Sequence, residues 1–168
     1  MSRAFVNEDL VADNAAPLER PISTDTNYVT PRGLRLLNQR LAELTAERSH
    51  LKEREEIATR DRLAEVERNL AYYAARVESA KLVPVPAQAP EQVTFGCRVT
   101  VAAPDGEEAN YTLVGEDEAD VEHHLISWVS PLGKALLGAH EGDLVAWRRP
   151  AGDVELEVVE IGLPAQAG

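Results

Sequence analysis

The sequence predicts an α+β fold, in which an antiparallel α-helical coiled-coil hairpin precedes an antiparallel β-sheet with one short helix. Two runs of apolar residues, 34–51 and 63–80, follow the three-four spacing of a coiled-coil seam and contain no proline. The proline-rich stretch VPVPAQAPEQ then breaks the helical pattern. Short alternating runs separated by turn signals fill most of the remaining chain.

Residues 1–29 predict a flexible extension, to which we assign no function. Asp, Asn, Pro, Ser and Thr are frequent there, and the apolar residues have no sustained period. The start lacks the apolar block of a secretion signal, and no window approaches the roughly 18 apolar residues of a membrane span. We therefore expect a cytoplasmic protein that makes no membrane contact.

Residues 30–83 predict the hairpin. Thr30 can cap the first helix and Pro31 suits its first position. If the two runs fold back on each other, Leu34 faces Ala80 and Leu51 faces Leu63, which puts the turn near residue 57 and the tip at 53–61. Thr59 is the expected cap of the returning helix. The full seam comprises Leu34, Leu37, Leu41, Leu44, Arg48 and Leu51, then Leu63, Val66, Leu70, Tyr73, Val77 and Ala80.

The same pattern leaves two other arrangements open, namely one uninterrupted helix or two helices of a larger bundle. The symmetric register favours pairing within one chain, and therefore a monomer.

We predict a linker over residues 84–92, the β domain over residues 93–163 and a tail over residues 164–168. The runs FGCRVTVAA, ANYTLVG, DLVAWRR and VELEVVEIG predict strands, with hairpin turns at Asp105-Gly106 and near Gly152. SPLGKALLG predicts the short helix, with Ser130 as its cap and Gly138 as its stop.

Charge is unevenly distributed along the chain, whose formal net charge is −12. Residues 84–168 carry fifteen acidic and four basic side chains. Because nucleic-acid binding depends on basic groups that neutralise phosphates, the charge of this half disfavours direct binding of nucleic acid and favours a basic protein surface as partner.

The cysteine and the adjacent histidines of the chain do not indicate a metal site within the protein itself. Cys97 is the single cysteine, which excludes an internal disulfide and a cysteine-rich zinc site, and its strand-like run predicts a buried thiol. His123 and His124 are adjacent, but no further residue pattern completes a ligand set. We interpret them as a surface pair.

Several segments together resemble the Gre family of transcription elongation factors. FGCRVTV, YTLVGEDEAD, LISWVSPLGKALLG, EGDLV and VELEVVEI resemble its C-terminal domain, in this order. YVTPRGLRLLNQRLAEL and RLAEVERNLAYYAARVESAKLV resemble the two arms of its coiled-coil hairpin. The resemblance covers roughly residues 28–163. It implies an FKBP-like C-terminal domain that docks at the rim of the RNA polymerase secondary channel, a hairpin that enters the channel, and contact with nucleic acid only through the polymerase.

In the family, carboxylates at the tip help to hold the second Mg²⁺ of the polymerase active site and so promote cleavage of backtracked RNA. Magnesium prefers such hard oxygen ligands, and paired ions stabilise both the attacking and the leaving oxygen. The resemblance makes Glu53, Glu55, Glu56 and Asp61 the candidate ligands of this shared Mg²⁺, with no cofactor of the protein's own.

The tip departs from the family pattern, approximately Gly-Asp-x-x-Glu-Asn-Ala-Glu/Asp-Tyr. Glu53 falls at the Glu of that pattern and His50 at its Asp. The arms are also shorter than the family norm by roughly 7 residues each, about 10 Å of reach. The sequence therefore predicts regulation of elongation, pausing or backtracking with weak or absent stimulation of cleavage, including the alternative of an inhibitory or competing channel binder. The tip acids are then a solvated turn, or contact the channel walls electrostatically.

The resemblance assigns contact with the channel rim to the segment matched by ISWVSP, namely Ser127, Trp128, Val129, Ser130 and Pro131. For Trp128 itself, packing in or near a core is the favoured interpretation.

Such a protein is a binding protein and not an enzyme. Two other functional classes remain as alternatives. A prolyl isomerase of the FKBP type needs an aromatic-lined pocket, for which the sequence offers too few and too scattered aromatic residues, namely Phe95, Tyr111, Trp128 and Trp147. A structural coiled-coil adaptor would pair the run from Leu34 to Leu51 between chains.

Overall fold

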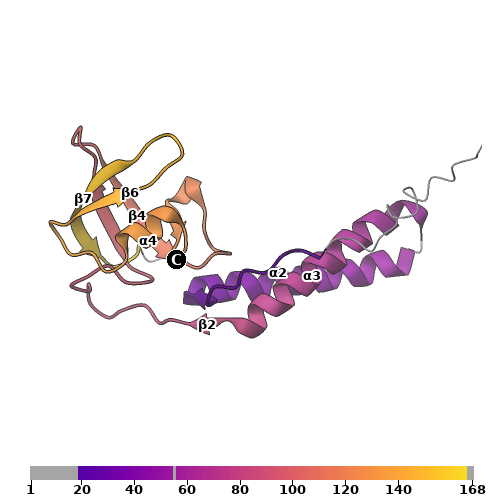
Figure 1. The fold of residues 1–168 in the computed structure, drawn as a ribbon. Helices are drawn as coiled ribbons and strands as arrows, with labels where there is room; N and C mark the ends of the chain where they lie inside the picture. Colours follow the sequence, from indigo (N-terminus) through magenta and orange to yellow (C-terminus); the bar gives the residue numbers. More distant parts are fainter. Residues whose placement is uncertain (1–18, 55, 166–168) are drawn as a thin grey trace, which may run out of the picture.

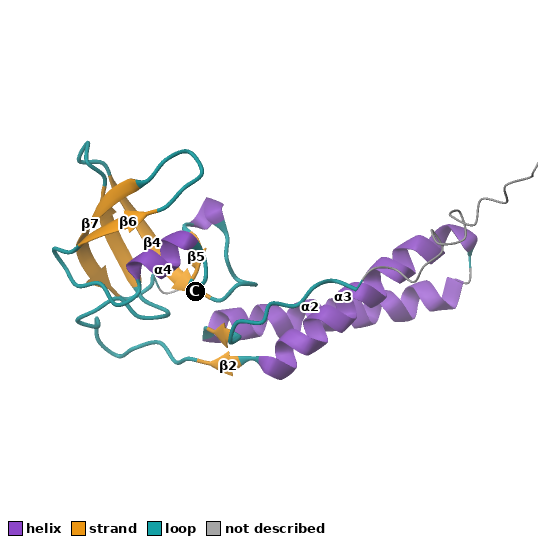
Figure 2. Cartoon of the chain, in the orientation of Figure 1, coloured by secondary structure: helices purple, strands orange, loops and turns teal. Residues whose placement is uncertain are grey.

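The computed structural model describes residues 19–54 and 56–165. It consists of a helical hairpin, residues 31–79, and a β unit, residues 93–162, which meet at the base of the hairpin (Figure 1). The hairpin projects from the β unit as a slender rod. The predicted α+β class and the order of its two parts are confirmed (Figure 2).

The hairpin is formed by helices α2 (Pro31–Arg54) and α3 (Arg60–Ser79). Thr30 caps α2 as predicted, because its Oγ1 accepts a hydrogen bond of 2.9 Å from the backbone N–H of Gly33. At 1.5 Å per residue, the 24 residues of α2 span about 36 Å. No helix in the described ranges is both long enough and apolar enough to cross a bilayer.

The predicted seam is the contact face between the two helices. Leu44 and Val66 are fully buried there, and every other predicted member is at least half-buried, except Arg48. Arg48 lies at the edge of the seam, where its Nε donates to Glu67 Oε1 across the hairpin at 3.3 Å. The two arms therefore pair antiparallel within one chain, which excludes the single uninterrupted helix.

The tip contains a short 3₁₀ turn, η1 (Ile57–Thr59), between the two helices. Thr59 stands at the N-cap of α3 as predicted, but its side chain makes no capping bond. Its hydroxyl donates instead to the Glu56 carbonyl at 2.7 Å. The expected capping role is therefore wrong: Thr59 already closes η1, and its αR backbone differs from the extended conformation of a typical cap.

The β unit is built on a five-stranded sheet with the order β5-β4-β3-β7-β6. The strands are β3 (Arg98–Ala102), β4 (Glu108–Val114), β5 (Leu125–Ser127), β6 (Leu144–Trp147) and β7 (Val154–Gly162). Tight turns containing Gly106 and Gly152, both with positive φ, join β3 to β4 and β6 to β7 as predicted.

The sheet is mixed, which corrects the prediction of an antiparallel one. Strand β5 pairs parallel with β4, whereas the other three pairings of the described sheet are antiparallel. The chain between Val114 and Leu125 crosses over through the 3₁₀ turn η2 (Val121–His123) and returns in the same direction. With only three residues, β5 is too short for an alternating pattern to reveal it.

The core of the β unit lies between the sheet and helix α4 (Pro131–Leu136). Ser130 caps α4 as predicted, with its Oγ accepting from the Gly133 N–H at 3.1 Å. Leu132 and Leu136 pack against the sheet beside the fully buried Cys97, so the predicted buried thiol is confirmed. Burial raises the pKa of that thiol.

The segment before the hairpin departs from the predicted flexible extension. Its strand β1 (Tyr28–Val29) pairs parallel with β2 (Lys81–Leu82), which follows the hairpin. Asn27 and Val29 are buried, so the prediction is wrong for residues 27–29. Their partners lie at the end of α3 and in β2, far along the chain, and local composition cannot reveal them. Residues 1–18 lie outside the described part of the chain.

Candidate functional site

The candidate metal-directed acids lie at the free end of the hairpin. Glu53 is exposed in the last turn of α2, Glu56 is exposed before η1, and Asp61 is exposed in the first turn of α3. Glu55 lies outside the described residues. The other three carboxylates make no ion pair with any described residue. In the described ranges no three metal-ligating side chains gather into a site. The structure thus brings these acids to one end of the rod but not to one centre.

The surroundings of the tip acids are mixed in charge. Asp61 stands in the first turn of α3, where the helix dipole favours a negative charge. Glu53 lies between Lys52 and Arg54 in the last turn of α2, and the exposed His50 is one turn earlier on the same helix. Lys52 reaches Glu67 across the hairpin at 4.0 Å. The tip is therefore hydrated and only locally negative.

The predicted docking segment, residues 127–131, runs from the end of β5 to the start of α4. Ser130 Oγ donates to the Ser127 carbonyl at 2.6 Å, and the Val129 N–H donates to Ser127 Oγ at 3.3 Å. A Cβ on Gly133 would collide with the Ser127 carbonyl. These constraints give the segment a fixed shape, in which Pro131 is exposed and the other four residues are half-buried.

Trp128 turns toward the base of the hairpin. Its ring packs edge-on against Tyr28 of β1, with the ring centroids 5.3 Å apart. Its Nε1 is buried and has no hydrogen-bond partner in the described part of the chain. The ring of Phe95 also packs on Tyr28, with the centroids 6.0 Å apart. Trp128 thus packs between the β unit and the hairpin, outside the hydrophobic core of the sheet.

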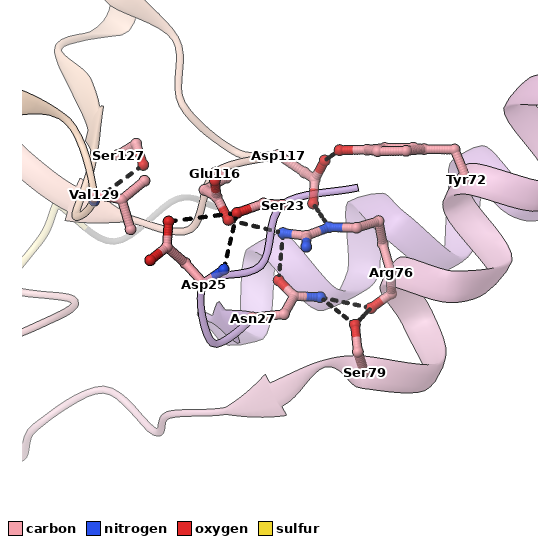
Figure 3. A network of polar contacts seen from close by, with 10 residues as sticks. All are labelled: Ser23, Asp25, Asn27, Tyr72, Arg76, Ser79, Glu116, Asp117, Ser127 and Val129. Carbon is pink, nitrogen blue, oxygen red and sulfur yellow. Dashed lines mark hydrogen bonds and ion pairs between the residues drawn. The ribbon is translucent and has the colours of Figure 1, made fainter. Parts of the chain in front are cut away.

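The most heavily buried charged side chain among the described residues lies next to this contact. Arg76 of α3 is 1% exposed and binds the loop that follows β4. Its Nε donates to Asp117 Oδ2 at 2.6 Å, and its Nη2 lies 3.4 Å from Glu116 Oε2. The Tyr72 hydroxyl, one helical turn earlier, donates to the other oxygen of Asp117 (Figure 3). We call this contact between α3 and residues 116–117 the joint.

Electrostatics inside the joint hold its members in one protonation state. Burial, and then the neighbouring Asp117 carboxylate, raise the pKa of Tyr72 to about 12. Burial disfavours the Arg76 cation, but the hydrogen bond and charge of Asp117 outweigh it, so the pKa of Arg76 is raised. At neutral pH Tyr72 is therefore neutral and Arg76 is a cation.

A second contact fastens α2 to the same loop. Glu118 is buried and accepts a hydrogen bond of 2.5 Å from the hydroxyl of Thr30, the cap of α2. Its other oxygen pairs with Arg32 Nη1 at 3.0 Å. The carboxylate lies so close to the first turn of α2 that a Cβ on Gly33 would stand 2.8 Å from it. The positive end of the α2 dipole favours a carboxylate in this place.

Sequence reasoning missed this joint. The acidic run GEDE at 115–118 reads as a solvated loop, and Arg76 reads as one more basic residue on a helix surface. One signal of this close contact is Gly115, because a side chain there would collide with the Tyr28 carbonyl. A glycine next to three acids directly after a strand is the pattern that could have pointed to a close contact.

The four aromatic residues considered for an isomerase pocket are not brought together. Tyr111 and Trp147 line an open hollow of about 530 Å³, whose lining also includes five acidic side chains. Phe95 and Trp128 lie elsewhere, packed on Tyr28.

The two adjacent histidines are exposed, as predicted. His123 Nδ1 lies 2.7 Å from Asp120 Oδ2, and His124 Nδ1 lies 3.0 Å from the Asn110 carbonyl oxygen.

Comparison with known proteins gives matches over both parts of the chain. Residues 88–162 match the family described as Transcription elongation factor, GreA/GreB, C-term. The chain is 33% identical over 162 residues to transcription elongation factor GreB of Neisseria meningitidis serogroup B, covering 83% of this chain and 96% of that protein. It is 38% identical over 128 residues to GreA of Pseudomonas aeruginosa, covering 74% and 80%.

Solved structures that match include Gfh1 of Thermus aquaticus, at 27% identity and a TM-score of 0.40, covering 80% of this chain and 97% of that one. Another is the transcription elongation factor GreA/GreB of Nitrosomonas europaea, at 24% identity and a TM-score of 0.40, covering 82% and 98%.

Proposed function

Because the chain belongs to the GreA/GreB family of transcription elongation factors, we propose that it binds bacterial RNA polymerase at the secondary channel and regulates elongation, pausing or backtracking. The hairpin enters the channel, while residues 127–131 contact the channel rim. The protein acts as a monomer in the cytoplasm, and it meets nucleic acid only through the polymerase.

The observation that carries this proposal is the fixed connection between the docking segment and the hairpin. Trp128 of the segment packs on Tyr28 at the hairpin base, and Arg76 of the hairpin is buried against the loop of the β unit. A rod attached in this way takes its direction from the surface on which the β unit docks. Such a geometry suits a protein that must present one tip inside a narrow opening.

Charge supports a protein partner. The β unit and its flanking residues, 84–168, carry fifteen acidic groups and four basic ones. Charges of this kind speed encounter with a basic protein surface and oppose direct contact with nucleic acid.

The tip supports regulation with little or no transcript cleavage. Glu53, Glu56 and Asp61 make no ion pair with described residues, so their oxygens are available to a Mg²⁺ ion shared with the polymerase, but no three metal-ligating side chains of the described residues gather into one site. Such an ion would polarise the scissile phosphate and activate water, and that catalysis belongs to the polymerase. His50, however, stands where the family pattern has its aspartate, and the arms are shorter. We therefore propose that this chain is not itself an enzyme. Its tip acts by electrostatic contact with the channel walls and by occupying space in the channel.

The test is a backtracked polymerase complex incubated with Mg²⁺ and the purified protein. We expect binding, measured by co-sedimentation, and little shortening of the RNA, measured on a gel. A variant of the protein replaces Glu53, Glu55, Glu56 and Asp61 together by alanine. Robust RNA shortening that this variant abolishes contradicts the non-cleaving role.

A matched control replaces the exposed acids Glu65 and Glu78 of the same hairpin by alanine, away from the tip. We expect it to behave as the unaltered chain. Absence of binding by the unaltered chain contradicts the proposed partner itself.

A further inference from the structure

The chain before the hairpin lies along α3. The guanidinium of Arg20 stacks on the ring of Tyr72, 3.7 Å from its centroid, and lies 5.3 Å from the ring of Tyr73. Its Nη1 donates to Asn69 Oδ1 at 3.1 Å. An arginine over an aromatic face is attracted by the ring and needs no carboxylate partner. Arg20 is thus anchored halfway along the hairpin.

A second anchor lies at Asn27, which is 5% exposed. Its Nδ2 donates to the Arg76 carbonyl at 2.7 Å and to Ser79 Oγ at 3.2 Å. Its Oδ1 accepts from Arg76 Nη2 at 2.8 Å. The amide group therefore satisfies both the end of α3 and the buried guanidinium, as Figure 3 shows.

The two anchors use the same two side chains of α3 that hold the β unit. Tyr72 offers its ring to Arg20 and its hydroxyl to Asp117. Arg76 offers Nη2 to Asn27 and Nε to Asp117. Tyr72 and Arg76 are four residues apart and therefore share one face of the helix. The segment before the hairpin and the loop of the β unit consequently hold these side chains from two directions.

The end of this segment closes the arrangement. The Lys81 N–H donates to the Asn27 carbonyl at 2.8 Å, and the Val83 N–H donates to the Val29 carbonyl at 2.9 Å. Tyr28, between them, places its ring against Trp128 of the docking segment. One stretch of chain thus contacts α3, the strand after α3 and the docking segment.

We propose that residues 19–29 form a strap that fixes the angle between the hairpin and the docking segment, with Arg20 and Asn27 as its positioning residues. The strap holds Tyr72 and Arg76 in the conformations in which they bind Asp117. Releasing it leaves the helices and the sheet intact and loosens only their relative orientation.

The magnitude follows from the kind of contact. Removing a cation from an aromatic face forfeits an interaction whose loss increases the population of a detached joint by about 2- to 30-fold. Removing the Asn27 amide as well leaves Arg76 with one partner fewer in a dry site, which increases that population further.

The test measures the orientation directly on the free protein. Spin labels on cysteines introduced at Ala46 of α2 and Lys134 of α4, both exposed, report the distance between hairpin and β unit, while Cys97 is too buried to react. We expect one narrow distance distribution for the unaltered chain and a broad one for the double variant Arg20→Ala, Asn27→Ala. We expect the single variant Arg20→Lys, which keeps a cation over Tyr72, to retain the narrow distribution. Arg40→Ala, which removes an exposed arginine of α2, is the matched control.

A narrow distribution in the double variant overturns the strap. A far-ultraviolet circular dichroism spectrum like that of the unaltered chain is required of every variant, which separates loss of orientation from loss of fold.

The consequence for transcription rests on the proposed function. There we expect the double variant to bind polymerase with little loss of affinity but to have a smaller maximal effect at saturation. An unchanged maximal effect overturns the positioning role. Failure of the unaltered chain to bind polymerase contradicts the proposed function alone, because the distance measurement needs no partner.

Discussion

At the scale of single residues, Arg76 carries the most consequential set of contacts. It is a buried cation whose partners come from the strap and from the β unit. We expect Arg76→Ala to lower the free energy of unfolding by about 3–5 kcal/mol, since it leaves Asp117 and Asn27 without their partner in a dry site. Urea unfolding followed by circular dichroism measures this. Arg40→Ala, which removes one exposed pair with Glu43, should change stability by less than about 1 kcal/mol. A loss for Arg76→Ala no larger than that of the control contradicts the buried joint.

Tyr72 makes the joint sensitive to alkaline pH. Its pKa is raised from 10.0 to about 12 in the folded protein, so folding favours the protonated phenol. The stabilising contribution is therefore complete below pH 10 and is lost as the pH rises from about 10 to about 12. We expect the unaltered chain to lose more stability across this window than Tyr72→Phe, which has no hydroxyl to ionise. Parallel curves for the two proteins, from unfolding experiments at a series of pH values, contradict this assignment.

Gly115 marks the closest backbone approach between the two parts. A Cβ there would collide with the Tyr28 carbonyl, so we expect Gly115→Ala to destabilise the protein by about 1–3 kcal/mol. Gly162→Ala is the control, since its Cβ would meet only the Arg98 side chain at an ordinary 3.6 Å. Thermal unfolding of both variants gives the comparison, and equal effects would show that the steric argument fails.

At the scale of elements, the two helix starts of the hairpin are capped differently. Thr30 binds the Gly33 N–H and Glu118, whereas the side chain of Thr59 makes no capping bond. We expect Thr30→Ala to cost about 1–2 kcal/mol and Thr59→Ala a few tenths. The matched pair of substitutions is compared by urea unfolding. A larger loss for Thr59→Ala means that the tip is capped in another way.

The elements also differ in how far sequence alone could predict them. The hairpin was predictable because residues 34–80 encode their own pairing: seam periodicity sets which face is buried, and symmetry about the turn sets the register. The turns at Gly106 and Gly152 and the cap at Ser130 were predictable because each depends on a few neighbouring residues. Strand β5 was not, because three residues carry no measurable alternation.

The joint and the strap were unpredictable for a different reason. Arg76 becomes a core residue only when Asp117 and Asn27, 41 and 49 positions away along the chain, meet it. A helical arginine and a run of acids are typical of solvated surfaces, and neither pattern contains its partner. For the candidate site, the resemblance in sequence therefore predicted the tip and the docking segment. The contacts that orient them are visible only in the structure, because they join residues far apart in the chain.

At the scale of the whole molecule, the hairpin satisfies its seam within one chain. Ion pairs such as Arg62 with Glu47, at 2.6 Å, close across the two arms. We expect a monomer in sedimentation velocity at all concentrations tested, because no long apolar stripe of the described helices remains for a second chain. A concentration-dependent dimer would favour the coiled-coil adaptor. The variant Leu44→Ala, which empties a fully buried seam position, should then weaken that dimer.

The neighbouring parallel strands β1 and β2 make the length of the rod a free variable. The chain enters and leaves the hairpin side by side, and the contacts of α3 with the strap and the β unit reach no further toward the tip than Asn69, so the hairpin beyond Asn69 can be extended without altering the attachment. One heptad inserted in each arm, in register with its opposite, would move the tip outward by about 10 Å. A series of chains whose hairpins differ in length by whole heptads would therefore measure the depth of the cavity that receives the rod, in steps of two helical turns.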